Sequence, residues 1–309
     1  MNSGSAIPAD PVTAPQAQEI YDSVVYRAGC SNEQDTLDCL RHVSYTRLLN
    51  AVNSVPGLLG YRSVDLSYLP RPDPGDNFFP ESPEVPGIAG KWPKIPIITG
   101  NQEDEGTLFA LPTPNITTHE NLVDYLASYF PNNPNATADV LGLLSTNYPD
   151  EPDLGQPAGS PFNTGSANNI YPQFKRLAAV LGDITFTLTR RVLLNYASEL
   201  TPCWSYLATY LHGTPIYGTG HGSDLLFNWG FLSQDAFPTR SIQAYYLNFV
   251  HNLDPNVGVE AEWLVDWPMY DTVNRTLLEF GNVTNGLMWD GFRMEASEFI
   301  QGHTANFRV

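Results

Sequence analysis

Two short segments of this chain carry side chains that could act together in acid–base chemistry. In residues 95–109, Ile-Pro-Ile-Ile-Thr-Gly-Asn-Gln-Glu-Asp-Glu-Gly-Thr-Leu-Phe, an apolar run breaks into an acidic turn that ends at Glu105. In residues 218–224, Gly-Thr-Gly-His-Gly-Ser-Asp, His221 lies between two glycines after another apolar stretch. A strand-end carboxylate followed by a loop histidine matches the second and third members of a Ser…Glu…His triad, in the chain order of α/β hydrolases. In such a triad the histidine takes the serine proton, and the carboxylate orients its ring.

The first member of that triad is absent from the sequence. No Gly-x-Ser-x-Gly motif, the turn that presents the nucleophilic serine, occurs in the 309 residues. Cys203 is an alternative nucleophile, but it lies in a predicted core strand and nothing around it resembles a nucleophile turn. Its simpler interpretation is a small buried hydrophobic residue. The sequence therefore contains candidates for the acid and the histidine of a triad but not for its serine.

Each candidate also has a structural interpretation. Glu103, Asp104 and Glu105 could form a solvated acidic turn in which no carboxylate faces inward. The abrupt end of a buried strand favours a functional role, because active sites of open α/β sheets lie at the carboxyl ends of strands. A single histidine is usually a surface or core residue, but Gly220 and Gly222 allow close backbone approach around this one.

Three further residues near these segments are open to two interpretations. Leu108 and Phe109 directly follow the acidic turn, where core packing is the simpler role. The alternative is that one of them lines an apolar pocket for an acyl chain. Asp224 follows the glycine-flanked histidine and could be a partner that supports the histidine or only a cap for residues 225–227, and we favour structural support.

The spacing of apolar residues predicts the elements that position these side chains. It predicts strands at 95–99 and 203–207, and helices at 20–29, 37–53, 118–129, 173–196 and 240–251. Residues 146–167, rich in Pro, Gly, Asp and Asn, are expected to form a long surface loop rather than a domain linker. The alternation of strands and helices indicates an α/β fold, with one sheet covered by helices on its faces, and a single domain over 1–309.

Composition excludes several classes of function. The 309 residues are 42% hydrophobic and 12% aromatic, which is typical of a globular protein. A net charge of −18 disfavours binding to nucleic acid or to anionic membranes. No run is apolar and long enough for a transmembrane segment, and the N-terminus lacks the basic and apolar regions of a signal peptide. The sequence indicates no metal site, since the two sulfurs of Cys30 and Cys39 alone make a poor zinc site.

Two features nevertheless point to an extracellular protein. Cys30 and Cys39 flank eight residues and could close a small staple outside the cytosol. Four Asn-x-Ser/Thr sequons could accept N-linked glycans, at Asn115, Asn135, Asn274 and Asn282. Secreted features without a secretion signal suggest that the true N-terminus lies upstream of Met1.

A set of longer motifs gives the chain a family resemblance. The motifs lie at 1–5, 28–30 with 39–40, 56–59, 68–73, 101–107, 159–165, 172–183, 218–224 and 267–270. In this order they resemble the fungal type-B carboxylesterase/lipase family, the group of the Candida rugosa and Geotrichum lipases, which is more distantly related to the cholinesterases. The resemblance implies an α/β-hydrolase fold, with Glu105 as triad acid, His221 as general base and a disulfide between Cys30 and Cys39.

The chain departs from this family in what it lacks. The family's nucleophile elbow, oxyanion loop, lid and first disulfide precede a segment like residues 1–4, so the resemblance implies a C-terminal portion with the N-terminal half missing. Such a chain is expected to be inactive as given and to expose part of helix 173–196 and one sheet edge. The intact enzyme would cleave a small-molecule or lipid ester, such as an acylglycerol, without a cofactor. The alternatives are a non-catalytic cholinesterase-like binding or adhesion module and a short decoy protein. Oligomeric state is not indicated.

Overall fold

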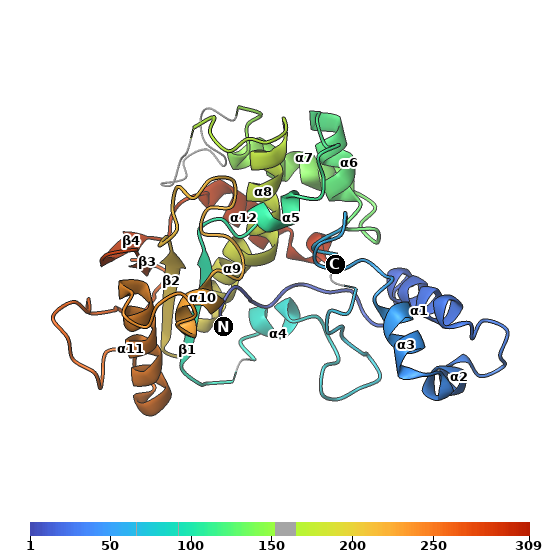
Figure 1. Cartoon of the computed structure of the whole chain (residues 1–309), viewed down its shortest axis with the longest axis horizontal. Coiled ribbons are helices and arrows are strands. Elements are labelled where there is room, and N and C mark those ends of the chain that lie inside the picture. Colours follow the sequence, from blue (N-terminus) through green and yellow to red (C-terminus); the bar gives the residue numbers. More distant parts are fainter. Residues whose placement is uncertain (66, 92, 152–164) are drawn as a thin grey trace.

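The protein contains a four-stranded mixed sheet, which lies in the left part of Figure 1. The computed structural model describes residues 1–65, 67–91, 93–151 and 165–309. Three parallel strands are followed by an antiparallel one, in the order β1 (Ile97–Gln102), β2 (Cys203–Ala208), β3 (Thr276–Phe280) and β4 (Asn285–Trp289). The two predicted strands are confirmed, although β1 begins later and extends to Gln102. The register pairs Gln102 with Ala208, so β1 and β2 end at the same edge of the sheet.

Helices surround this sheet and build a second, helical core beside it. The helices before β2 are α1 (Pro15–Ala28), α2 (Thr36–His42), α3 (Tyr45–Val52), α4 (Glu84–Ile88), α5 (Thr107–Ala110), α6 (His119–Ala127), α7 (Ala136–Asn147), α8 (Phe174–Gly182), the π-helix η2 (Asp183–Thr187) and α9 (Leu188–Ala197). Those after β2 are α10 (Asp224–Asn228), α11 (Phe237–Asn252), α12 (Met294–Gly302) and the 3₁₀-helix η3 (Thr304–Phe307). In the described part of the chain, no helix is long and apolar enough to cross a bilayer.

The alternation of side chains along β2 explains why both faces of the sheet are covered. Trp204 and Tyr206 pack into the apolar cluster that includes residues of α11, on one face. Cys203 and Leu207 pack with residues of α9 on the other face. A strand that is buried on both sides in this way requires apolar residues at nearly every position. The expectation of a sheet with helices on its faces is confirmed.

The predicted helix 173–196 is formed by α8, η2 and α9 in direct succession, and it is not exposed as expected. Phe174, Leu177 and Leu194 are each 1% exposed or less. The helix contacts α5, α12 and α4, which cover the faces that we expected to be open. The expectation was wrong because α12 was not predicted from the sequence.

The outer edge of β1 is only partly covered. The first residues of the chain run beside it, with the backbone N–H of Ser3 donating to the carbonyl of Gly100 at 2.8 Å. Ile95 before β1 and Val250 of α11 line an open pocket with Met1 and Asn2 at this edge, and they are 60% and 72% exposed. This part of the expected exposure therefore agrees with the structure.

Helices α1 to α3 form a satellite unit that lies away from the sheet (Figure 1). Its own apolar cluster includes Val24, Ala28 and Ala51. The predicted helix 20–29 ends as expected, with Gly29 in the left-handed conformation at φ 72°. The predicted helix 37–53 is instead two helices, because the chain turns at Val43 and the side chain of Ser44 caps α3. The loop predicted for 146–167 lies mostly outside the described residues, as do positions 159–164 of the motif 159–165.

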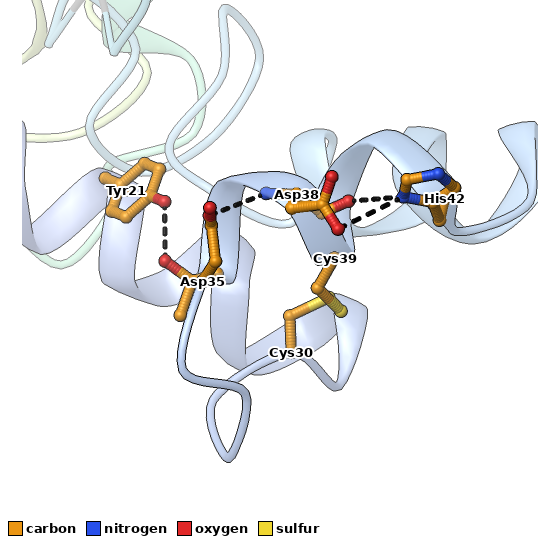
Figure 2. The surroundings of a disulfide bond; sticks show 7 residues. Tyr21, Cys30, Asp35, Asp38, Cys39 and His42 are labelled. Atoms are coloured by element: carbon orange, nitrogen blue, oxygen red, sulfur yellow. Dashed lines mark hydrogen bonds and ion pairs between the residues drawn. A yellow bond between two sulfur atoms is a disulfide. The ribbon is translucent and has the colours of Figure 1, made fainter.

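A disulfide between Cys30 and Cys39 joins the end of α1 to α2, and Figure 2 shows it between the two helices. Cys203 is a free thiol, buried in β2. Burial raises the pKa of the Cys203 thiol to about 11, so that it is not a thiolate at neutral pH. The interpretation of Cys203 as a small buried residue agrees with this environment, and the alternative of a catalytic thiol does not.

We expect secreted material to contain the Cys30–Cys39 bond while Cys203 reacts with thiol reagents only after unfolding. Non-reducing peptide mapping measures both. Replacing Cys30 and Cys39 by Ser should destabilise the protein by about 3 kcal/mol, the loss of unfolded-state constraint for a short loop. Detection of Cys203 linked to either partner would contradict this assignment.

Candidate active site

Glu105 and His221, which are far apart in the sequence, are hydrogen-bonded in the structure. The distance between His221 Nδ1 and Glu105 Oε2 is 2.7 Å. The other carboxylate oxygen, Oε1, accepts a hydrogen bond of 2.8 Å from the backbone N–H of Gln102 at the end of β1. The side chain of Glu105 is 1% exposed and that of His221 is 26% exposed. Among the described residues His221 Nε2 has no hydrogen-bond partner, so this nitrogen can meet a group from outside them.

Glycines allow the backbone to bring the pair together. A Cβ atom at Gly106 would lie 1.8 Å from the carbonyl oxygen of Ala178, so the turn after Glu105 can contact α8 only without a side chain. A Cβ atom at Gly220 would lie 2.6 Å from the ring of Tyr217. Gly222 has a φ of 83°, which favours glycine. Close approach at Gly220 and unusual backbone at Gly222 agree with the sequence interpretation.

The loop that carries His221, residues 209–223 between β2 and α10, is called the histidine loop below. Glu103 contacts it through His212, with 2.7 Å between Oε1 and Nδ1. Asp104 accepts a hydrogen bond of 2.9 Å from the backbone N–H of Thr219. The side chain of Glu103 is only 5% exposed. The interpretation of these acids as a solvated turn is therefore wrong, because all three consecutive carboxylates bind one loop.

Aromatic rings line one side of His221. The Phe186 ring lies 4.8 Å from the His221 ring and the Phe109 ring lies 5.2 Å from it, measured between centroids. Phe109 is 1% exposed, whereas Leu108 is partly exposed. Phe186 belongs to the π-helix η2, a local widening that often occurs at functional sites. Sequence reasoning missed Phe186, since helical spacing does not show where a π-turn will rotate a side chain.

The remaining predicted residues lie apart from this pair. Asp224 is 8% exposed and accepts from Asn228 at 3.4 Å within α10, which agrees with a structural role. The four sequon asparagines are all exposed, at Asn115, Asn135, Asn274 and Asn282. Within the described ranges, no group of three or more His, Cys, Asp and Glu side chains could hold a metal ion.

Burial raises the pKa of Glu103 from 4.5 to about 9. The neighbouring carboxylates of Asp104 and Glu279 raise it further, while Arg293 and the Thr219 hydroxyl lower it only in part. The proton is thus bound more tightly in the folded state than in the unfolded state. This contribution to stability is complete below pH 4.5 and is lost progressively as the pH rises to about 9.

We therefore expect Glu103→Gln to gain stability relative to the parent as the pH rises from about 5 to 9. A glutamine does not ionise, so the variant lacks the penalty that accumulates in the parent over this range. Thermal unfolding midpoints of both proteins across the range measure the difference. Parallel curves for the two proteins would show that Glu103 ionises normally.

Comparison with known proteins provides an independent line of evidence. A family model described as "Carboxylesterase family" matches residues 1–300. The chain is 48% identical to Secreted lipase 1 of Botryotinia fuckeliana, over 100% of this chain and 52% of that protein. It is also 48% identical to Secreted triacylglycerol lipase LIP1 of Gibberella zeae, over 97% of this chain and 50% of that protein. The chain thus spans about half the length of these curated relatives.

Solved structures show the same fold. The crystal structure of Aspergillus niger EstA superposes with a TM-score of 0.74 at 20% identity, covering 100% of this chain and 58% of that one. At this identity the likeness concerns the fold alone. The expectation of an α/β-hydrolase fold is confirmed, and the resemblance inferred from the sequence motifs agrees with the family model.

Proposed function

The chain belongs to the carboxylesterase family, and from this premise we propose that the protein hydrolyses carboxylic esters with His221 as general base and Glu105 as the acid that orients it. The observation that carries the proposal is the 2.7 Å contact between His221 Nδ1 and Glu105 Oε2. This contact occupies Nδ1, while Nε2 has no hydrogen-bond partner among the described residues. The site does not support the non-catalytic alternative. A binding or adhesion module would not need the Glu105–His221 pair, and this pair is intact.

The proposed reaction proceeds through an acyl-enzyme. His221 Nε2 takes the hydroxyl proton of a serine while the serine oxygen attacks the ester carbonyl carbon. His221 then returns the proton to the leaving alkoxide as the bond to the alcohol breaks. Water repeats the sequence and releases the acid. The Glu105 carboxylate holds the Nδ1–H tautomer and balances the positive charge of the ring.

The serine and the oxyanion donors would come from residues other than these 309, in which no Gly-x-Ser-x-Gly motif occurs. Residues 1–309 would then form part of one catalytic domain. The apolar rings of Phe109 and Phe186 beside His221 support a lipophilic ester, such as an acylglycerol, as substrate. The names of the two relatives, the disulfide and the exposed sequons support an extracellular location.

The proposal is tested by comparing the chain with a chimera. In the chimera this chain replaces the matching part of Secreted lipase 1 of Botryotinia fuckeliana, to which it is 48% identical. We expect the purified chain to leave p-nitrophenyl butyrate unhydrolysed, since it has no nucleophile elbow, and the chimera to hydrolyse it. Release of p-nitrophenol measures both.

Two results would count against the proposal. Turnover by the chain alone that a serine-directed phosphonate abolishes would mean that an unrecognised serine acts within it. A chimera that folds with a cooperative thermal transition but does not hydrolyse esters would mean that this chain does not supply a working acid–base pair.

A further inference from the structure

We propose that Glu103 and His212 are positioning residues, forming a second hydrogen-bonded acid–histidine pair that holds the histidine loop so that His221 meets Glu105 in the reactive geometry. This inference rests on the proposed ester hydrolysis. It adds two residues whose side chains would touch neither substrate nor serine and would act only through His221.

The first support is that both ends of the contact are anchored. The backbone N–H of Glu103 donates to the carbonyl of Ala208 at 3.0 Å, so Glu103 continues the pairing of β1 with β2. Its carboxylate then contacts His212 Nδ1 at 2.7 Å. The histidine loop leaves β2 at this point. The pair therefore fixes the start of the loop to the edge at which β1 ends.

The second support is a short path from His212 to His221. The backbone N–H of Leu211, next to His212, donates to the hydroxyl of Thr219 at 3.1 Å. Thr219 is fully buried, and its own backbone N–H donates to Asp104 at 2.9 Å. Thr219 precedes His221 by two residues. A change in the position of His212 is thus transmitted through one buried threonine to the backbone of the general base.

The third support is the burial of Glu103, because burying an acidic side chain costs free energy that a surface residue would not lose. Its Oε2 atom is buried and has no hydrogen-bond partner among the described residues. It lines a cavity of about 70 Å³ together with Asp183 and Arg293. Asp104 on the same turn and Glu279 on β3 disfavour its charge, and Arg293 at the start of α12 favours it. His212 Nδ1 is the contact that offsets this burial.

The cavity also makes the pair suitable for substitution. Because space lies beside the carboxylate, a leucine at position 103 can be accommodated without overpacking. His212 is 45% exposed, so a leucine there changes a side chain at the surface. Variants that lack this pair are therefore expected to fold.

The experiment measures kcat and KM of the chimera for p-nitrophenyl butyrate. Glu103→Leu and His212→Leu should each lower kcat roughly 10- to 100-fold with little change in KM, the size of effect expected for a misplaced catalytic group. The double variant should be no worse than either single variant, since both remove one interaction. Glu103→Gln and His212→Asn, which can keep a hydrogen bond between the two positions, should retain most of the activity.

Two further measurements separate positioning from general stability. In the 309-residue chain labelled with ¹⁵N-histidine, the His221 Nδ1–H signal should shift in His212→Leu and remain in place in His212→Asn. The matched control is His42→Leu, which removes an exposed histidine 3.5 Å from Asp38, in the satellite unit. It should alter neither kcat nor the His221 signal.

The outcomes distinguish this inference from the proposed function. Parental kcat in both leucine variants, together with a large loss in Glu105→Gln, overturns the inference and leaves ester hydrolysis by the pair intact. Parental kcat in Glu105→Gln overturns both. A lower melting temperature with unchanged kcat means that the pair only stabilises the fold, which also overturns the inference. If Glu103→Leu does not fold, the kcat of His212→Leu and the His221 Nδ1–H signal in that variant test the inference.

Discussion

Glu105→Gln and His221→Ala should each lower kcat of the chimera by about four orders of magnitude, the loss measured for the acid-to-amide change in a serine-protease triad. Without His221 no group takes the serine proton. Without a carboxylate at Glu105, the Nδ1–H tautomer is no longer enforced and the imidazolium is not stabilised. Glu105→Gln should fold, because a glutamine at position 105 can still accept from the backbone N–H of Gln102, as Oε1 does at 2.8 Å in the parent. His221→Ala should fold because it shortens a side chain that is 26% exposed on a loop. The measurement is kcat for p-nitrophenyl butyrate alongside the thermal transition.

The matched controls are Glu19→Gln and His42→Ala, both at exposed positions in the satellite unit, which should be silent. A second control lies within the acidic turn and compares Glu103 with Glu105. Glu103→Gln should retain most of the activity, because a glutamine can still hydrogen-bond to His212. If Glu103→Gln were crippling and Glu105→Gln harmless, the assignment of the triad acid within this turn would be wrong.

Asp290→Ala should destabilise the protein by about 3–5 kcal/mol, the cost of breaking a buried ion pair by removing one partner. Asp290 is fully buried and accepts from Arg190 at 2.8 Å and from Arg191 at 2.7 Å. Its removal leaves two guanidinium groups without their shared carboxylate under the sheet. Urea unfolding of the chimera and its Asp290→Ala variant measures the effect. Asp235→Ala, at an exposed position before α11, is the control.

The stability that Asp290 contributes should also depend on pH. Burial alone would raise the pKa of Asp290, but Arg190 and Arg191 outweigh it and hold the pKa below its usual range of about 3.8. The stability that this carboxylate contributes is therefore present above that range and is lost as the pH falls below it. The parent should lose more stability than Asp290→Ala on acidification. Equal losses in the two proteins would show that the ion pair contributes little.

Local patterns were sufficient to predict the elements that carry the chemistry. β1 and β2 were found because their apolar runs end at turn residues, and both candidate residues were found because they follow those ends. The hairpin of β3 and β4 was missed, since β4 is an edge strand of only five residues that begins with Asn and Gly. Its Leu287 and Trp289 are 50% and 62% exposed, so the strand lacks the pattern of a buried one. Helix α12 was missed as well, and its absence led to the wrong expectation of an exposed α8–α9 face.

The contacts around the site depend on chain segments that are distant in sequence. The local sequence around Glu103 does not show whether its side chain is solvated or is buried against another loop, because its partner His212 is 109 residues away. Phe186 reaches His221 through a π-turn, which apolar periodicity does not reveal. Sequence reasoning therefore predicted that Glu105 and His221 act together, whereas the structure was needed to find the contacts that hold them in place.

Whether His221 activates the nucleophile is measured by the pre-steady-state burst of p-nitrophenol when the chimera is mixed with p-nitrophenyl butyrate. We expect a burst of about one equivalent in the parent, from the acyl-enzyme that forms once His221 removes the serine proton. We expect no burst in His221→Ala at the same pH and substrate concentration. A burst of the parental size and rate in His221→Ala would contradict the proposed function, because His221 would then not be the base that activates the nucleophile.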